Sequence, residues 1–197
     1  MNHAFRVLAA TLFVGILFVG CATSTTVSFL EESPAISDGP TLFERWDDFA
    51  EAARLSAGVQ AEGRTVLEIA QPYGNSLLVW HFTDLEPEQP VKVTIEVWVN
   101  ATANESWFAL LGAPGLAPAN ASGYGRLAGE DGEHYLARWG SDGAGLGTTT
   151  EGWAVVTDAT MRADAAGNFT VGISTGHWSN NPELVLMYVS SLSVSSQ

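Results

Sequence analysis

The sequence predicts an all-β fold, in which two antiparallel sheets form a sandwich after an N-terminal export signal. Residues 91–100 alternate strictly between apolar and polar side chains, and this period of two is typical of a half-buried antiparallel strand. No segment of the expected domain sustains helical periodicity beyond about two turns. The 20 glycines, the seven tryptophans and the abundant valine and threonine favour many short strands joined by turns.

The expected domain covers residues 41–197, and its strands follow one another with turn-forming residues between them. The candidate strands are Leu42–Trp46, Thr65–Ala70, Ser76–Thr83, Val91–Asn100, Glu105–Leu111, Glu133–Trp139, Trp153–Met161, Asn168–Thr175 and Leu184–Val194. Asp47–Leu55 has a helical composition but is short, and Ala52–Val59 is equally compatible with an extended chain. The long excursion Ala113–Asp131 is rich in Gly, Pro and Asn, and long loops of compact domains are often functional.

The N-terminus has the pattern of a signal peptide over residues 1–20. Met1–Arg6 carries positive charge and no acid, and Val7–Gly20 is an apolar run interrupted only by Thr11. This run is shorter than the roughly 20 apolar residues that a membrane-spanning helix needs. The sequence therefore predicts export across a membrane.

Leu17–Cys21 (LFVGC) resembles a bacterial lipobox, in which the Cys thiol receives diacylglycerol before the signal is cleaved. Phe18 departs from the aliphatic residue usual at its position. Ordinary secretion with a spare thiol, or an uncleaved anchor, is the alternative. Cys21 is the only cysteine, so it has no partner for a disulfide within the chain, and the resemblance implies lipidation at Cys21.

Residues 21–40 are rich in Ser, Thr and Pro and have little to bury, which predicts a flexible tether between the lipid and the domain. Within this tether, Val27–Leu30 is compatible with a short strand.

The chain is acidic, with a formal net charge of −14 and Lys92 as its single lysine. Such a surface repels phosphate backbones and therefore disfavours nucleic acid as a partner. It also repels anionic lipid headgroups, so the expected membrane contact is the acylated Cys21 and not a basic patch.

Six short pieces of the chain occur in an order that characterises one group of sandwich domains. They are Phe43–Glu44, Gly63–Leu67, Pro90–Asn100, Gly152–Val156, Gly167–Val171 and Met187–Ser193. Their order resembles the jelly-roll carbohydrate-binding modules that accompany glucanases and xylanases, and the wider galactose-binding-like group. The resemblance implies a jelly-roll sandwich that binds a poly- or oligosaccharide without cleaving it. The family often uses an acidic residue of the closing strand for a structural calcium. Ser190 and Ser191 stand there, so calcium is doubtful even with Glu44 present, and no cofactor is expected.

Trp98 is the first candidate for a sugar contact, because it falls on the polar side of its strand with Glu96 and Asn100. Flat aromatic faces pack against pyranose rings, while amides and carboxylates bond the hydroxyl groups. Trp107 is a candidate second platform, and Trp139 and Tyr124 are candidates to flank the site from the long loops. The alternative is that this face is simply a partly covered sheet surface. Core packing is expected for three other tryptophans, Trp46, Trp80 and Trp153.

Catalytic motifs are not apparent. The glycine-rich runs contain no G-x-S-x-G, and the histidines lack metal-ligand spacing. Gly140–Gly147 contains no lysine, which excludes a phosphate-binding loop of the common kind. The sequence thus predicts a non-enzymatic lipoprotein of the cell envelope, lipid-anchored and facing the periplasm or the exterior, with a carbohydrate-binding-like domain. An envelope protein that uses the same fold to contact an unknown protein partner is the alternative.

Overall fold

The computed structural model describes residues 24–27, 41–48, 54–70, 74–99, 106–117, 119–120, 126–127, 134–140, 153–177 and 185–197. Its strands are β1 (Ser24–Val27), β2 (Thr41–Asp48), β3 (Arg54–Ala61), β4 (Arg64–Ala70), β5 (Gly74–Phe82), β6 (Pro90–Val99), β7 (Ser106–Pro114), β8 (Ala119–Asn120), β9 (Arg126–Leu127), β10 (His134–Gly140), β11 (Trp153–Arg162), β12 (Phe169–His177) and β13 (Val185–Ser196). Among these residues, no helix is long and apolar enough to cross a membrane.

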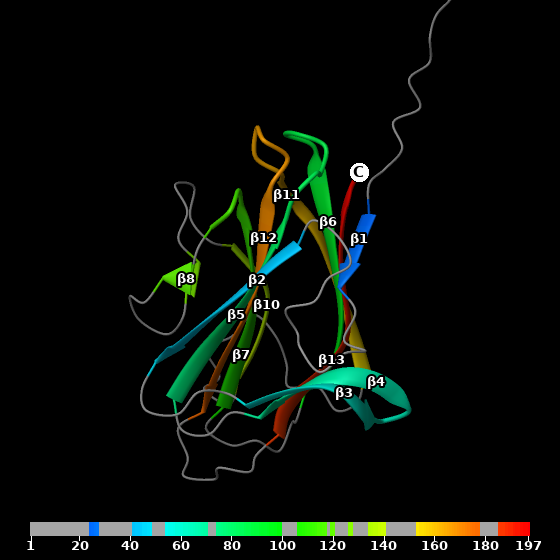
Figure 1. The fold of residues 1–197 in the computed structure, drawn as a ribbon, viewed down its shortest axis with the longest axis vertical. Coiled ribbons are helices and arrows are strands. Elements are labelled where there is room, and N and C mark those ends of the chain that lie inside the picture. Colours follow the sequence, from blue (N-terminus) through cyan, green and yellow to red (C-terminus); the bar gives the residue numbers. More distant parts are fainter. Residues whose placement is uncertain are drawn as a thin grey trace, which may run out of the picture.

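Two antiparallel sheets face each other, so the predicted all-β sandwich is confirmed (Figure 1). Sheet A has the order β11-β6-β13-β4-β3, with β1 also paired to β13, and sheet B has the order β10-β7-β12-β5-β2. The short pair β8–β9 lies outside sheet B (Figure 1).

The core lies between the sheets and is filled by inward-facing residues of strands such as β4, β6, β12 and β13. In β6, Val91, Val93, Ile95, Val97 and Val99 are all buried in this core, as the alternation predicts. Trp80 of β5 is fully buried in the same cluster, which confirms its predicted core position. The residues between them in β6 consequently point to the outer face of sheet A.

The segment that was ambiguous between helix and strand is extended at both of its ends. Asp47 and Asp48 belong to β2, and Arg54 and Leu55 belong to β3, while residues 49–53 lie outside the described residues. The extended reading is therefore the correct one at these ends.

The segment expected to be a flexible tether contributes a strand. Residues 24–27 form β1, which pairs with β13, and the Val27 side chain is buried. Sheet A thus reaches closer to Cys21 than the sequence suggested, with pairing to β13 and burial of Val27 holding this segment on the sheet.

The β3–β4 hairpin leaves the plane of sheet A. β4 pairs with β13 only as far as Val189, and β1 takes over the same edge of β13 from Leu192 onward. Glu62 and Gly63 form the turn with φ angles of 50° and 78°, the two positive values that a tight type I′ hairpin requires. Figure 1 shows β3 and β4 running nearly crosswise to β6 and β13.

The outer face of sheet B is covered by the chain itself. Leu77, Val79, Ala109, Leu111 and Ala113 of sheet B form a second buried cluster with Ala117 and Leu127, which come from the excursion that follows β7. The described part of the predicted Ala113–Asp131 loop therefore packs as a cover over sheet B.

A buried threonine fastens this cover. The Thr170 hydroxyl donates to the carbonyl oxygen of Gly115 at 2.7 Å and accepts from the backbone N–H of Ala117 at 3.0 Å. Because its single proton is used on Gly115, the Nδ1 of His81, 2.9 Å away, is the donor in the third contact. The bonds to Gly115 and Ala117 hold the start of the excursion against β12, and the bond from His81 joins Thr170 to β5.

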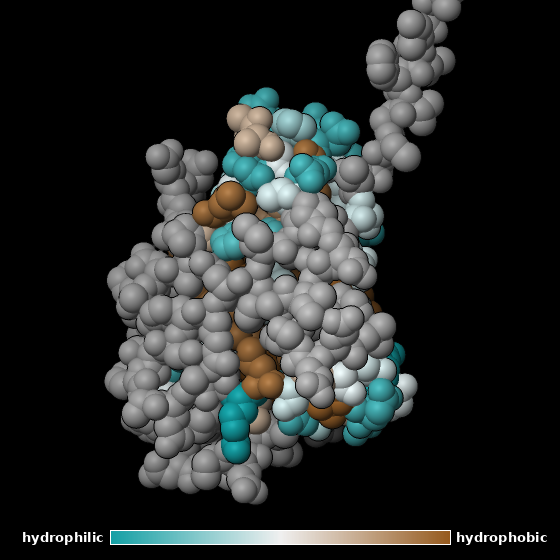
Figure 2. Space-filling model, in the orientation of Figure 1, coloured by the Kyte–Doolittle hydropathy of each residue, from teal (hydrophilic) through white to brown (hydrophobic). Residues whose placement is uncertain are grey.

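One end of the sandwich is closed by interlocked turns. Leu85 donates its N–H to the carbonyl of Gly167 at 3.0 Å, and Asp164 accepts from the N–H groups of Ala166 and Asn168. Gly167 has a φ of +77°, and a Cβ there would lie 2.3 Å from the Leu85 carbonyl oxygen, so only glycine fits. Figure 2 shows mostly hydrophilic residues at this upper end.

Candidate functional site

Three aromatic side chains lie abreast on the outer face of sheet A. In register, Trp153 of β11 pairs with Trp98 of β6, and Trp98 pairs with Tyr188 of β13. The Trp98 and Tyr188 rings are 5.1 Å apart between centroids and tilted by 33°. All three side chains are half-buried, so parts of them remain accessible. We call these three residues the aromatic row.

The aromatic row is continued by acidic and polar residues on the neighbouring strands. Glu68 of β4 is the register partner of Tyr188, and Ser56 of β3 is the partner of Glu68. Burial raises the pKa of the Tyr188 phenol above its ordinary value of 10.0, and the Glu68 and Glu62 carboxylates raise it further. The Tyr188 hydroxyl therefore stays protonated at neutral pH and is available as a hydrogen-bond donor.

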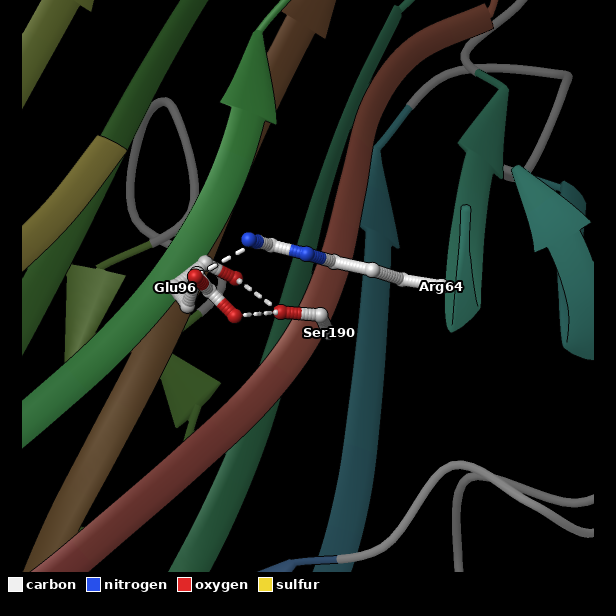
Figure 3. Close-up of polar contacts among 3 residues, drawn as sticks. All are labelled: Arg64, Glu96 and Ser190. Carbon is white, nitrogen blue, oxygen red and sulfur yellow. Dashed lines mark hydrogen bonds and ion pairs between the residues drawn. The ribbon is translucent and has the colours of Figure 1, made fainter. Parts of the chain in front are cut away.

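Glu96 lies beside the aromatic row, two residues before Trp98 in β6. A β-bulge in β13 shifts the register between Val189 and Ser191, which brings the Ser190 hydroxyl to 2.5 Å from Glu96 Oε2. The same hydroxyl lies 3.5 Å from the Glu96 backbone oxygen. Figure 3 shows Glu96 held between Ser190 and Arg64.

Arg64, at the start of β4, reaches over β13 to this carboxylate. Its Nη1 is 2.5 Å from Glu96 Oε1, and this buried nitrogen makes no aligned hydrogen bond, so the contact is an ion pair. The guanidinium carbon also lies 4.2 Å from the centroid of the Trp153 ring, in cation–π geometry. One arginine thus connects β4, β6 and β11.

Apolar surface is also exposed beside these groups. Val155, the register partner of Glu96 in β11, is 64% exposed, although it is a large hydrophobic residue. The outer face of sheet A therefore combines aromatic rings, an exposed valine and carboxylates within a few strands.

The structure brings together only some of the residues predicted as ligand contacts. Trp98 and Glu96 lie on the outer face of sheet A. Trp107 is in β7, opposite Gly176, and Trp139 is in β10, opposite Phe108, so both belong to sheet B and not to the sheet of Trp98. Cys21, Asn100 and Tyr124 lie outside the described residues.

Three residues of this face were missed by the sequence analysis. Trp153 was expected in the core, but it pairs with Trp98 and is half-buried, so that prediction was wrong. In β11 the outward residues Trp153 and Val155 are apolar, and so is Ala154 between them. Without apolar–polar alternation, the sequence does not indicate which of these side chains face the core. Tyr188 and Arg64 became recognisable only through the register of β13 and the bend of the β3–β4 hairpin.

No protein-family model and no curated protein matches this chain. Several solved structures are similar in the course of their strands. A cleaved adhesin domain of Lys-gingipain from Porphyromonas gingivalis is 13% identical, with a TM-score of 0.49, and the match covers 89% of this chain and 99% of that one. TmCBM61 in complex with β-1,4-galactotriose is 11% identical, with a TM-score of 0.44 and coverages of 79% and 88%.

The enzymatically active domain of tailspike protein 4 from bacteriophage CBA120 is 8% identical, with a TM-score of 0.45. That match covers 85% of this chain but only 20% of the tailspike, so this chain spans about a fifth of its length.

Acidic and histidine residues do not gather into a metal-binding group within the part of the chain that the structure describes.

Proposed function

We propose that the outer face of sheet A binds a poly- or oligosaccharide without cleaving it. The observation that carries this proposal is the aromatic row, three half-buried rings abreast on a face that also bears carboxylates. Aromatic rings supply flat apolar surfaces for the faces of pyranose rings, and a few well-placed polar groups bond the hydroxyls.

The polar groups around the row suit hydroxyl recognition. Glu68 is an acceptor next to Tyr188, and the protonated Tyr188 hydroxyl is a donor. Glu96 carries two acceptor oxygens beside the row, one bonded by Ser190 and the other paired with Arg64, and each carboxylate oxygen has a further lone pair for a ligand hydroxyl. A ligand that stacks on the row thus meets both donors and acceptors at its edges.

The test compares two truncations of exposed or half-exposed apolar side chains. Trp98→Ala removes the central ring, whereas Leu116→Ala removes a 48% exposed leucine from the segment after β7, away from this face. On a glycan array and in polysaccharide pull-downs, the wild type and Leu116→Ala are expected to bind equally. Trp98→Ala is expected to lose about fivefold or more in affinity, since one stacked ring contributes on the order of 1 kcal/mol or more. If no glycan binds, or if Trp98→Ala binds like the wild type, the proposal fails.

We further propose that the domain is held at a membrane of the cell envelope by an acylated Cys21. β1 begins at Ser24, three residues after Cys21, and three extended residues span only about 10 Å. Ser24 pairs with Ser195, whereas Trp98 pairs with Tyr188, seven residues earlier in β13, which is about 23 Å along the strand. A domain anchored in this way carries the aromatic row at the end of sheet A away from the lipid. Mass spectrometry of the mature protein tests the anchor, and an unmodified Cys21 or a different mature N-terminus contradicts it.

A protein partner in the envelope is the second candidate, and the 64% exposure of Val155 favours it. Exposed apolar surface beside aromatic rings also suits a protein interface. Co-purification of one envelope protein with the wild type, lost in Val155→Asp and in Trp98→Ala without any glycan binding, would support this candidate over the first.

A further inference from the structure

We infer that Arg64 is a positioning residue of the proposed binding face: it fixes the Trp153 ring and the Glu96 carboxylate before a ligand arrives and stays in place when one binds. This inference rests on the proposed function, and it assigns a role to a residue that makes its contacts within the protein.

The first support is the distance that the Arg64 side chain bridges. β4 and β6 are the two neighbours of β13, so they are about 10 Å apart in a flat sheet, and β11 lies one strand further. The residues of β4 that precede Leu67 are not paired with β13, and here the β3–β4 hairpin turns across sheet A. This bend lets Arg64 extend over Ser190 to Glu96 and Trp153, as Figure 3 shows for the first two.

The second support is the kind of contact. A planar guanidinium can pair with a carboxylate at its edge and lie over an indole with its face, which a lysine ammonium cannot do in one geometry. Arg64 makes both contacts at once, at 2.5 Å to Glu96 Oε1 and 4.2 Å to the Trp153 centroid. Its charge is compensated by Glu96 and its Nη1 is buried, although the Arg64 side chain as a whole is 37% exposed.

The third support is that the two held groups have few other constraints among the described residues. Trp153 Nε1 is buried without a hydrogen-bond partner, so no bond from the indole nitrogen fixes the ring. Glu96 has the Ser190 hydroxyl on one oxygen and Arg64 on the other. When an aromatic ring and a carboxylate are already held in one arrangement, a ligand does not have to order them. The loss of side-chain entropy on binding is therefore smaller.

The binding experiment uses the full chain, β1 included, and three variants, measured against whichever glycan binds the wild type. Arg64→Met removes the charge, and Arg64→Lys keeps the charge without the planar stack. Arg162→Met is the matched control, because Arg162 is exposed and donates to the backbone carbonyl oxygen of Glu88, at the end of the sandwich that the interlocked turns close. We expect Arg64→Met and Arg64→Lys each to weaken binding about tenfold, and Arg162→Met to leave it unchanged. In a Trp153→Leu background, Arg64→Met is expected to have a smaller additional effect than in the wild type, because only the contact with Glu96 is then left to lose.

A spectroscopic measurement on the wild type avoids any folding defect of the variants. The Arg64 Nε–H resonance is expected to carry a ring-current shift from Trp153, identified by its loss in Trp153→Leu, and to keep that shift at glycan saturation. Loss of the shift at saturation overturns the inference, because it would mean that the ligand displaces the Arg64 guanidinium from the Trp153 ring. Wild-type affinity in Arg64→Met also overturns it while leaving the binding face intact. If Trp98→Ala likewise binds as the wild type does, the proposed function itself fails.

Discussion

The two outer faces of the sandwich are built in opposite ways. On sheet B, the outward residues are small or aliphatic, such as Ala109, Gly172 and Val79, and the chain itself covers them with Leu127 and Ala117. On sheet A, the outward residues of the central strands include Trp98, Tyr188 and Glu96, and they are only half-buried.

The difference shows where a ligand can be accommodated. On sheet B, even a Cβ at Gly172 would lie 3.1 Å from Leu77 and 3.3 Å from Leu127, so the cover is in close contact with the sheet. That face is part of the folded core, and its residues determine stability. On sheet A, large rings and charged groups remain partly accessible, so this is the face that the proposed ligand can reach without displacing packed chain.

The largest expected effect comes from loosening the covered face. Leu127→Ala removes a buried side chain from above Gly172 and Leu77, and truncation of a buried leucine costs about 2–5 kcal/mol of unfolding free energy. Chemical denaturation should show this loss, while glycan binding on sheet A should be unchanged. A variant as stable as the wild type would show that the segment around Leu127 does not pack against sheet B.

A somewhat smaller effect is expected from the hydroxyl that fastens the same cover. Thr170→Val leaves the Gly115 carbonyl, the Ala117 N–H and the His81 Nδ1 without their shared partner. Burying unpaired polar groups costs about 1–3 kcal/mol, so the unfolding free energy should fall by that amount. Thr170→Ser keeps the hydroxyl and serves as the control. Equal stability of the Val and Ser variants would contradict this account of the network.

The fold was largely predictable from sequence, because a period of two in residues 91–99 places their side chains directly. Candidate residues within one strand, Trp98 and Glu96, were found for the same reason. Trp153 was misassigned because an outward tryptophan and valine on β11 look like core residues when the partner strand is unknown. Whether the outer face of a sheet is covered depends on segments that are distant in the sequence, as Leu127 lies over Gly172. The residues around either position do not indicate that contact.

Arg64 illustrates the same limit for the binding face. Nothing near residue 64 in the sequence indicates Glu96 or Trp153, since the three residues lie on β4, β6 and β11. Their meeting depends on the register of β13 and on the bulge at Ser190, which are properties of the assembled sheet. Trp107 and Trp98 were grouped as two platforms from alternation alone, yet their strands belong to different sheets.

A smaller effect, confined to alkaline pH, is expected at Tyr188. Its pKa is raised in the folded protein by burial and by Glu68 and Glu62, so the folded state holds the phenolic proton more tightly than the unfolded chain does. The contribution of this group to stability is therefore fully present below pH 10.0, the ordinary pKa, and is lost as the pH rises above it. Tyr188→Phe should lessen the decline of the unfolding free energy in that range and change little at neutral pH. An unchanged alkaline slope in Tyr188→Phe would show that the phenol does not titrate in this environment.

The smallest effect is expected from Val155→Thr on sheet A, which is compared with the same substitution on sheet B, Val79→Thr. Val155→Thr on sheet A changes a side chain that is 64% exposed, so the unfolding free energy should stay within about 0.5 kcal/mol of the wild type. Val79→Thr on sheet B buries a hydroxyl at a fully buried position in an apolar cluster, which should cost about 1–3 kcal/mol. The two variants have the same volume change and the same added group, so thermal and chemical unfolding report only the environment of each face. If the two losses are equal, the outer face of sheet A is as closed as that of sheet B, and a ligand can reach the aromatic row only after a rearrangement.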